Sequence, residues 1–157
     1  MRREYPAALQ RMVDETIARY PKKQAALLPM LHLVQREVGF IGPDEERWVA
    51  RTLGLRPIKV REVTTFYTMI MRRPIGRYHI QVCSNLTCTL LGSQSLLEYL
   101  QKKLGCGVGE TTADQKFTLS SVECLGACEQ APCLMVNWDY HGRLDKEKID
   151  QIVESLK

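Results

Sequence analysis

Four cysteines in the second half of this 157-residue chain have the type and spacing of metal ligands. Cys83 and Cys88 form a C-x4-C pair, and Cys124 and Cys128 form a C-x3-C pair. Thiolates are the usual protein donors to iron–sulfur clusters, and two irons in tetrahedral sulfur coordination need four of them. Either pair alone is a weak signal, but the two pairs together predict one [2Fe–2S] cluster.

Two other uses of clustered cysteines fit this spacing less well. Structural zinc loops favour C-x2-C, which neither pair has, so a zinc module stays as a remote alternative. Dithiol redox chemistry of the thioredoxin type uses C-x-x-C at a helix N-terminus, and that motif does not occur in the sequence. Iron therefore fits these cysteines better than zinc or a disulfide.

The residues around the pairs suit a cluster. Gly126 and Ala127 are small, so backbone N–H groups can approach sulfur, and such hydrogen bonds help to set a cluster's reduction potential. Cys106 and Cys133 are interpreted as small, partly buried thiols. Cys133 could pack behind the cluster, but nothing in the sequence requires it to bind iron.

Composition places few limits on function. The chain is 45% hydrophobic and 25% charged, with a formal net charge of +4, which is ordinary for a soluble protein. Its longest apolar stretch, residues 25–34, is about ten residues and too short to span a membrane. The first residues have no apolar signal core, so we expect a soluble, intracellular chain.

The cysteines also divide the chain. All six lie between residues 83 and 133, which leaves the first half without any. That half is predicted to form short helices separated by proline and glycine. The expected helical segments are a first helix with Leu9, Met12, Val13 and Ile17 on one face, a buried helix over 24–38 distorted at Pro29, a helix from Pro43 to Gly54, and a fourth after Pro57 with Val60, Val63, Tyr67 and Ile70 on one face.

The second half changes to strand-like alternation. The expected elements are a strand at 78–83, a helix at 93–104 capped by Ser93, strands at 117–122 and 133–136, and a last helix after Asp145. Each cysteine pair then follows a strand. Neighbouring strands that end together would bring both loops to one sheet edge, where the four sulfurs could meet.

The first half also contains a rival signal. Residues 44–69 have the helix, glycine turn and helix of a DNA-binding helix-turn-helix. The second helix, however, offers only Lys59 and Arg61 near its start and is otherwise apolar, aromatic or hydroxyl-bearing. A packing face or a protein interface around residues 66–71 is favoured over DNA binding.

Longer stretches of the sequence carry a family resemblance. The segments VTTFYTMIMRRPIGRYHIQVC, KKLGCGVGETTADQKFTL and VECLGACEQAPCLMVN resemble the thioredoxin-like [2Fe–2S] subunit of NADH:quinone oxidoreductase, respiratory complex I. The resemblance implies an α+β fold, with a helical bundle over 1–75 followed by a thioredoxin-like ferredoxin domain with a mixed β-sheet over 76–157. Its cluster ligands correspond to Cys83, Cys88, Cys124 and Cys128.

The resemblance also implies partners and a location. The chain would exchange electrons with a flavin-bearing, NADH-oxidising subunit, at the cytoplasmic face of the membrane, without entering the membrane or binding nucleic acid. It has no Gly-rich phosphate loop, so FMN and NADH are expected on the partner alone. Related subunits of NAD-linked hydrogenases and formate dehydrogenases are the alternative.

Overall fold

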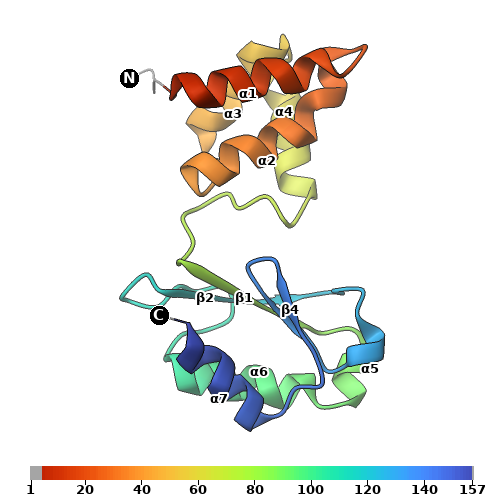
Figure 1. Ribbon diagram of the computed structural model, residues 1–157, viewed down its shortest axis with the longest axis vertical. Coiled ribbons are helices and arrows are strands. Elements are labelled where there is room, and N and C mark those ends of the chain that lie inside the picture. Colours follow the sequence, from red (N-terminus) through yellow and green to blue (C-terminus); the bar gives the residue numbers. More distant parts are fainter. Residues whose placement is uncertain (1–4, 157) are drawn as a thin grey trace. The chain divides into compact units, whose positions relative to one another are not determined.

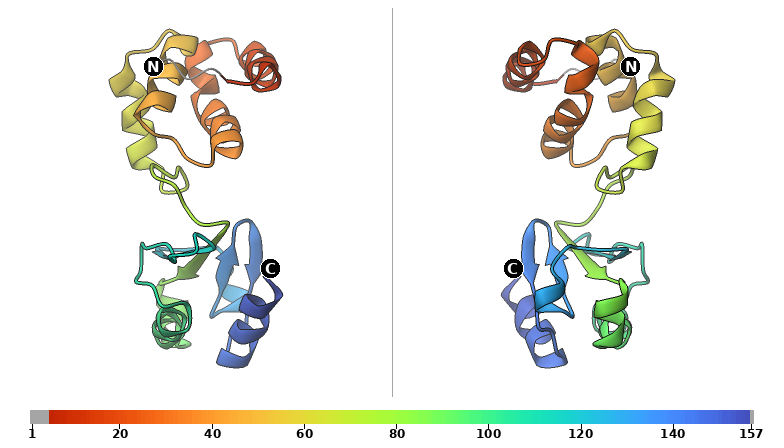
Figure 2. Two further views of the ribbon diagram at one scale, coloured as in Figure 1. Left: turned by 90° about the vertical axis from the view of Figure 1, so that its left-hand side faces the viewer. Right: turned by 90° about the vertical axis from the view of Figure 1, so that its right-hand side faces the viewer.

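The computed structural model describes residues 5–156. The chain divides between Pro74 and Ile75 into two compact units, a helical unit and a unit built on a β-sheet (Figure 1, Figure 2). Each unit has a hydrophobic core of its own. The described apolar side chains therefore do not form one continuous core.

The first unit consists of short helices. They are α1 (Ala7–Ala18), the 3-10 turn η1 (Lys23–Ala26), α2 (Leu27–Val38), α3 (Pro43–Leu53) and α4 (Pro57–Phe66). Their boundaries follow local signals: Gly39 and Gly54 end α2 and α3 in left-handed conformation, and proline begins α3 and α4. The core is formed by residues such as Leu9, Val13, Met30, Leu31, Val34, Val49 and Val60.

Three sequence expectations in this unit are corrected. Met12 is 41% exposed rather than on the buried face. The expected helix over 24–38 is a 3-10 turn up to Ala26 and an α-helix only from Leu27, so Pro29 lies in the first turn of α2, where its missing N–H would have no helical partner anyway. Helix α4 ends at Phe66, and Ile70 reaches the core from the following loop.

Hydrogen bonds to Gln35 of α2 hold that loop. The Gln35 side-chain amide donates to Met69 O and accepts from Met71 N, while Ile41 N donates to Met71 O. The chain leaving the helical unit is thus fastened to it as far as Met71, which lets an apolar side chain be buried outside any helix.

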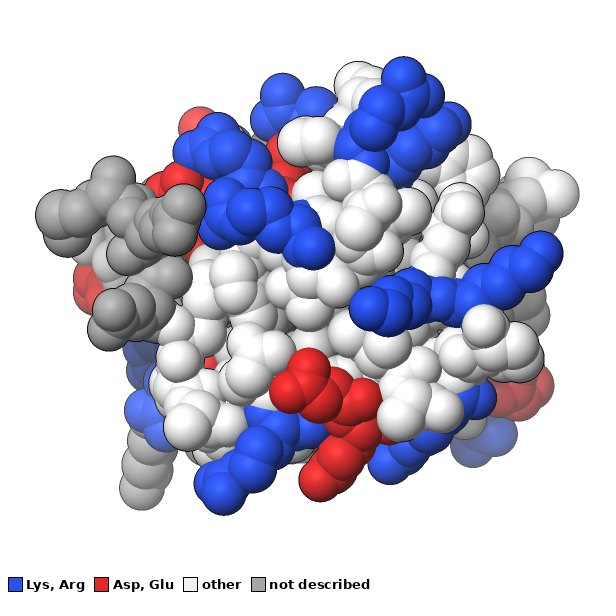
Figure 3. Space-filling view, turned by 90° about the horizontal axis from the view of Figure 1, so that it is seen from above, with Lys and Arg blue, Asp and Glu red and all other residues white. Residues whose placement is uncertain are grey.

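The helix-turn-helix pattern is present as α3 and α4, but the two basic residues of α4 are paired. Lys59 Nζ lies 2.9 Å from Glu62 Oε2, and Arg61 Nε lies 3.1 Å from Glu46 Oε2. On the face drawn in Figure 3, Lys and Arg lie in separate groups with acidic side chains among them. A nucleic-acid surface gathers unpaired cations along one stripe, so this arrangement does not favour DNA binding.

The second unit is built on a mixed sheet. Its elements are β1 (Tyr78–Cys83), α5 (Leu86–Leu90), α6 (Ser93–Leu104), β2 (Phe117–Val122), the 3-10 turn η2 (Cys128–Gln130), β3 (Leu134–Val136), β4 (Asp139–His141) and α7 (Lys146–Ser155). The strand order is β2-β1-β3-β4, with β1 and β2 parallel and the other pairs antiparallel. Helices α6 and α7 lie along one face of the sheet (Figure 1). The expected α+β class with a mixed sheet is confirmed.

Local details of this unit differ from the sequence expectations. Gly92, in left-handed conformation, is the N-cap of α6, and Ser93 is the first helical residue without a capping hydrogen bond. The second strand of the hairpin, β4, begins at Asp139, before His141 and Gly142. The loop after Cys83 contains the short helix α5, which the sequence analysis did not predict.

Gly76 permits the start of the sheet. A Cβ on this residue would lie 2.8 Å from the carbonyl carbon of Phe117, closer than backbone allows. Its N–H donates to Thr118 Oγ1 at 2.6 Å. The glycine therefore brings the chain against β2 immediately before β1 begins.

Within residues 5–156, no helix has the length and apolar character needed to cross a bilayer.

Candidate metal centre

The sheet brings the two cysteine loops to one edge. Because β1 and β2 are parallel and Cys83 pairs with Val122, both strands end at the same level. Ser84 N donates to Val122 O at 2.9 Å just beyond the paired residues. The loops that carry Cys83 with Cys88 and Cys124 with Cys128 therefore leave the sheet side by side, as expected.

The first loop turns its cysteines inward. Asn85 caps α5 by accepting a hydrogen bond from Leu86 N. Within this five-residue helix, Cys88 is buried at 1% exposure, whereas Leu86 and Leu90 are 71% and 76% exposed. Helix α5 thus presents a sulfur to the interior and leucines to the surface.

The second loop covers the first. Ala127 is buried in one cluster with Cys83 and Cys88, and Leu125 packs against that cluster. Gly126 adopts a φ of 71°, and its N–H donates to Cys124 Sγ at 3.3 Å. Glycine is the residue that reaches this left-handed conformation without strain, so the loop can turn its N–H groups toward sulfur.

Cys133 is the third buried sulfur of this cluster. The sulfur atoms of Cys83, Cys88 and Cys133 all lie within 4.8 Å of one another, and those of Cys88 and Cys133 are 3.7 Å apart. The pairing of β1 with β3 explains the placement, because Cys83 N donates to Cys133 O. The sequence placed Cys133 at the start of a strand. Which strand lies next to it, and so which cysteine it meets, depends on the order of strands in the sheet.

The four cysteines predicted as cluster ligands are thus placed differently. Cys83 and Cys88 are buried together, while Cys124 and Cys128 are exposed and lie outside the three-sulfur group. The loop between Cys124 and Cys128 nevertheless contacts the buried pair through Ala127.

The environment affects the three buried thiols unequally. Burial would raise the pKa of Cys83, but backbone N–H groups of Asn85 and Leu125 donate to its sulfur and lower the pKa overall. Burial raises the pKa of Cys88. Burial, together with the adjacent Cys88 sulfur, raises the pKa of Cys133 to about 12. The N–H groups of the two loops therefore favour a thiolate at Cys83.

These residues fit a [2Fe–2S] cluster by their chemistry. Two loops from one sheet edge offer soft thiolate donors, and the N–H groups of Leu125 and Gly126 already point at sulfur, as expected of groups that stabilise negative charge on cluster ligands. The exposed positions of Cys124 and Cys128 leave the outer side of such a cluster close to the protein surface.

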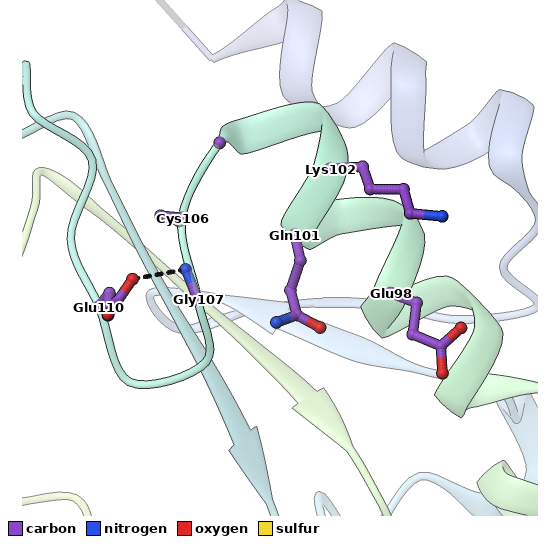
Figure 4. A pocket seen from close by; sticks show the side chains of 7 residues that line it. Glu98, Gln101, Lys102, Cys106, Gly107 and Glu110 are labelled. Atoms are coloured by element: carbon purple, nitrogen blue, oxygen red, sulfur yellow. Dashed lines mark hydrogen bonds between the residues drawn. The ribbon is translucent and has the colours of Figure 1, made fainter.

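Cys106 belongs to a different part of the unit. It lines a shallow pocket with Glu98, Lys102 and Glu110 at the end of α6 (Figure 4). Glu110 accepts a hydrogen bond from Gly107 N at 2.7 Å, and burial followed by the Glu110 charge raises the pKa of Cys106. A raised pKa leaves less of the thiol ionised near neutral pH, and the thiolate is the nucleophilic form, so Cys106 is a weaker nucleophile than an exposed cysteine.

Comparison with known proteins identifies the family. The family model described as thioredoxin-like [2Fe-2S] ferredoxin matches residues 13–157. This chain belongs to that family. The match includes both cysteine loops and most of the helical unit, so the thioredoxin-like [2Fe–2S] ferredoxin pattern extends over nearly the whole chain.

Curated family members are named as subunits of one enzyme, NADH-quinone oxidoreductase. The subunit from Rhizobium meliloti (strain 1021) is 47% identical over 92% of this chain and 86% of its own length. The corresponding subunit from Mycobacterium bovis is 42% identical over 99% of this chain. The chain covers 63% of the mycobacterial protein. The resemblance drawn from the sequence segments is thereby confirmed.

A solved structure supports the fold. A chain in the crystal structure of NAD+-reducing [NiFe]-hydrogenase in the air-oxidized state matches 83% of this chain with a TM-score of 0.73 and 24% identity. This chain corresponds to 22% of that hydrogenase chain. At this identity the likeness concerns the fold alone.

Proposed function

We propose that this chain is an electron carrier that holds one [2Fe–2S] cluster on Cys83, Cys88, Cys124 and Cys128, as the thioredoxin-like subunit of an NADH–quinone oxidoreductase. The observation that carries the proposal is the parallel pairing of β1 and β2. Because the two strands end together, both cysteine loops begin at one sheet edge. The names of the relatives, together with their identity over most of the chain, supply the enzyme.

The chain's own residues hold and tune the site. When bound, the cluster supplies a centre that accepts and gives up one electron at a time. The thiolates fix its position, and the N–H groups of Leu125 and Gly126 reduce the cost of negative charge on sulfur. Ala127, buried among the cysteines, excludes water from the inner side. No bond-making residue is required in this chain.

The partner in the proposal is a flavin-bearing, NADH-oxidising subunit that carries FMN and binds NADH. Electron exchange needs the flavin near the cluster, so the partner docks where the cysteine loops reach the surface. Helix α5 and the residue after it expose Leu86, Leu90 and Leu91 there, at 71%, 76% and 57%. Large apolar side chains grouped beside a redox centre are typical of a partner interface.

The two units have separate roles in the proposal. Residues 76–157 form the cluster-bearing domain, and residues 1–75 form a helical bundle that contributes contacts to the rest of the complex. The complex places the chain at the cytoplasmic face of the membrane, with no segment of this chain inserted.

Cluster analysis of cysteine variants tests the ligand set. Protein purified without oxygen should be brown, contain equal amounts of iron and acid-labile sulfide, and give an electron paramagnetic resonance signal after reduction. Alanine at each of the four proposed ligands should remove most of the cluster. Cys106→Ala and Cys133→Ala are the matched controls and should keep it; an equal loss in all six variants would contradict the assignment.

A second candidate is the corresponding subunit of an NAD-linked hydrogenase, which the solved hydrogenase structure favours on fold alone. The two candidates predict the same cluster but different assemblies. Purification of the tagged chain from its native cell should recover quinone-reductase subunits under the first proposal and hydrogenase subunits under the second.

A further inference from the structure

The three buried sulfurs have the spacing of ligands to one ion. A tetrahedral metal with metal–sulfur bonds of about 2.3 Å separates its sulfurs by about 3.8 Å. Cys88 and Cys133 are 3.7 Å apart, and Cys83 completes a group whose members all lie within 4.8 Å. Two of the proposed cluster ligands, Cys83 and Cys88, therefore form with Cys133 a triangle of thiols that a single soft metal can bridge.

The scaffold holds this triangle in place. Cys83 ends β1, and its N–H donates to Cys133 O across the pairing with β3. Cys88 is buried in α5, which Asn85 caps. The exposed fractions of the three cysteines are 3%, 1% and 1%, so metal binding would require little movement of ordered chain.

We propose that, in the cluster-free chain, Cys83, Cys88 and Cys133 bind one thiophilic divalent ion such as Zn²⁺, with the fourth position open to an added ligand. Binding replaces the thiol protons with the metal, so protons are released to solvent. Cys124 and Cys128 take no part, because they are exposed and outside the group.

The consequence is competition for the site. Because Cys83 and Cys88 are also ligands in the proposed function, on which this consequence rests, an ion on the triangle blocks cluster assembly. Cys133 is the residue that separates the two states: it serves the single ion and not the cluster. Cys128 is its counterpart: it serves the cluster and not the ion.

Cobalt titration tests the three-sulfur site directly. The full-length chain is stripped of cluster by chelator under reducing, anaerobic conditions, and Co²⁺ is added while the thiolate-to-metal absorption is recorded. We expect one tetrahedral Co²⁺ per chain, displaced by Zn²⁺. Cys133→Ser and Cys83→Ser should weaken Co²⁺ binding at least tenfold and reduce the intensity of the thiolate band. Cys124→Ser, Cys128→Ser and Cys106→Ser should leave both unchanged.

Cluster reconstitution with iron and sulfide completes the experiment. Preloading with Zn²⁺ should prevent assembly in the unaltered chain and not in Cys133→Ser, whose uptake of cluster also shows that the variant folds. The assignment of the three ligands is contradicted if Cys133→Ser binds Co²⁺ as tightly as the unaltered chain. It is also contradicted if Cys124→Ser or Cys128→Ser weakens Co²⁺ binding as much as Cys133→Ser does. The proposed function fails separately, if Cys128→Ala assembles a full cluster.

Discussion

Gly142 lies directly against Gln130: a Cβ on the glycine would overlap the Cβ of Gln130 and would be 2.7 Å from its carbonyl oxygen. The contact joins the end of the β3–β4 hairpin to the turn that follows Cys128. Arg143 N strengthens it by donating to Gln130 O. The second cysteine loop is therefore held in place by a position that has no room for a side chain.

Gly142→Ala should consequently displace the second cysteine loop. Gly142 does not have a positive φ, so alanine adds bulk without backbone strain. We expect a loss of stability of about 1–3 kcal/mol, as for other overpacked sites, and a changed visible circular dichroism spectrum of the cluster. Gly54→Ala, at the end of a helix in the other unit, is the control and should leave the cluster spectrum unaltered. An unchanged spectrum in Gly142→Ala would show that the loop does not depend on this contact.

Leu90→Glu should weaken docking of the flavin-bearing subunit. Leu90 is 76% exposed, so the substitution should not affect folding, but a charge buried in an apolar interface is costly. At least a tenfold loss of affinity is expected in titration calorimetry with the isolated partner. Val108→Glu, at an exposed position of the same unit away from α5, is the matched control. Equal affinities for both variants would place the interface elsewhere.

The stability of the second unit should decrease in mild acid because of His79. Burial lowers the pKa of this histidine, whose Nε2 lies 2.8 Å from Ser120 Oγ. The folded state keeps it neutral where the unfolded chain, with a pKa of about 6.5, takes up a proton. Its contribution is therefore complete above about pH 6.5 and is lost as the pH falls toward the lower folded pKa.

Urea unfolding at a series of pH values measures this effect. His79→Gln should flatten the dependence of the unfolding free energy on pH below about 6.5. His141→Gln should remove a further part, since burial lowers the pKa of His141 as well. If the unfolding free energy depends on pH in both variants as it does in the unaltered chain, these histidines are not the source of the acid sensitivity.

Glu46→Ala should destabilise the helical unit. Glu46 is 6% exposed, accepts from Thr64 Oγ1 at 2.7 Å and pairs with Arg61, which joins α3 to α4. Its removal leaves the buried Thr64 hydroxyl with a weaker set of partners, at a cost of about 1–3 kcal/mol in denaturant unfolding. Glu62→Ala breaks the exposed pair with Lys59 and should cost no more than about 0.5 kcal/mol. Similar losses in both variants would mean that burial of Glu46 contributes nothing.

Removal of the cluster should loosen the second unit and not the first. A unit of about 80 residues has a limited hydrophobic core, and a metal centre that ties two loops adds stability to it. Amide hydrogen exchange should become faster in β1 and β2 of the cluster-free chain, while α2 keeps its protection. Equal exchange rates in both forms would show that the cluster does not stabilise the fold.

Much of the fold could be predicted from the sequence, because its signals are local. Helix α3 runs from Pro43 to the residue before Gly54, and the alternation of residues 78–83 corresponds to β1. Cysteine spacing pointed to a metal centre, and longer segments pointed to the family that the comparisons confirm. Periodicity, helix-ending glycines and ligand spacing act within a few residues, so they can be read without knowing the neighbours.

Tertiary structure alone decided which distant residues meet. Cys133 lies beside Cys88, 45 positions away, because β3 pairs with β1, and no pattern within either segment specifies that pairing. The burial of Ile70 in a loop and the exposure of Met12 on a helix likewise depend on how distant segments pack. Alternation and helical period say which side of an element is apolar, but the sheet order and the path of loops determine what that side contacts.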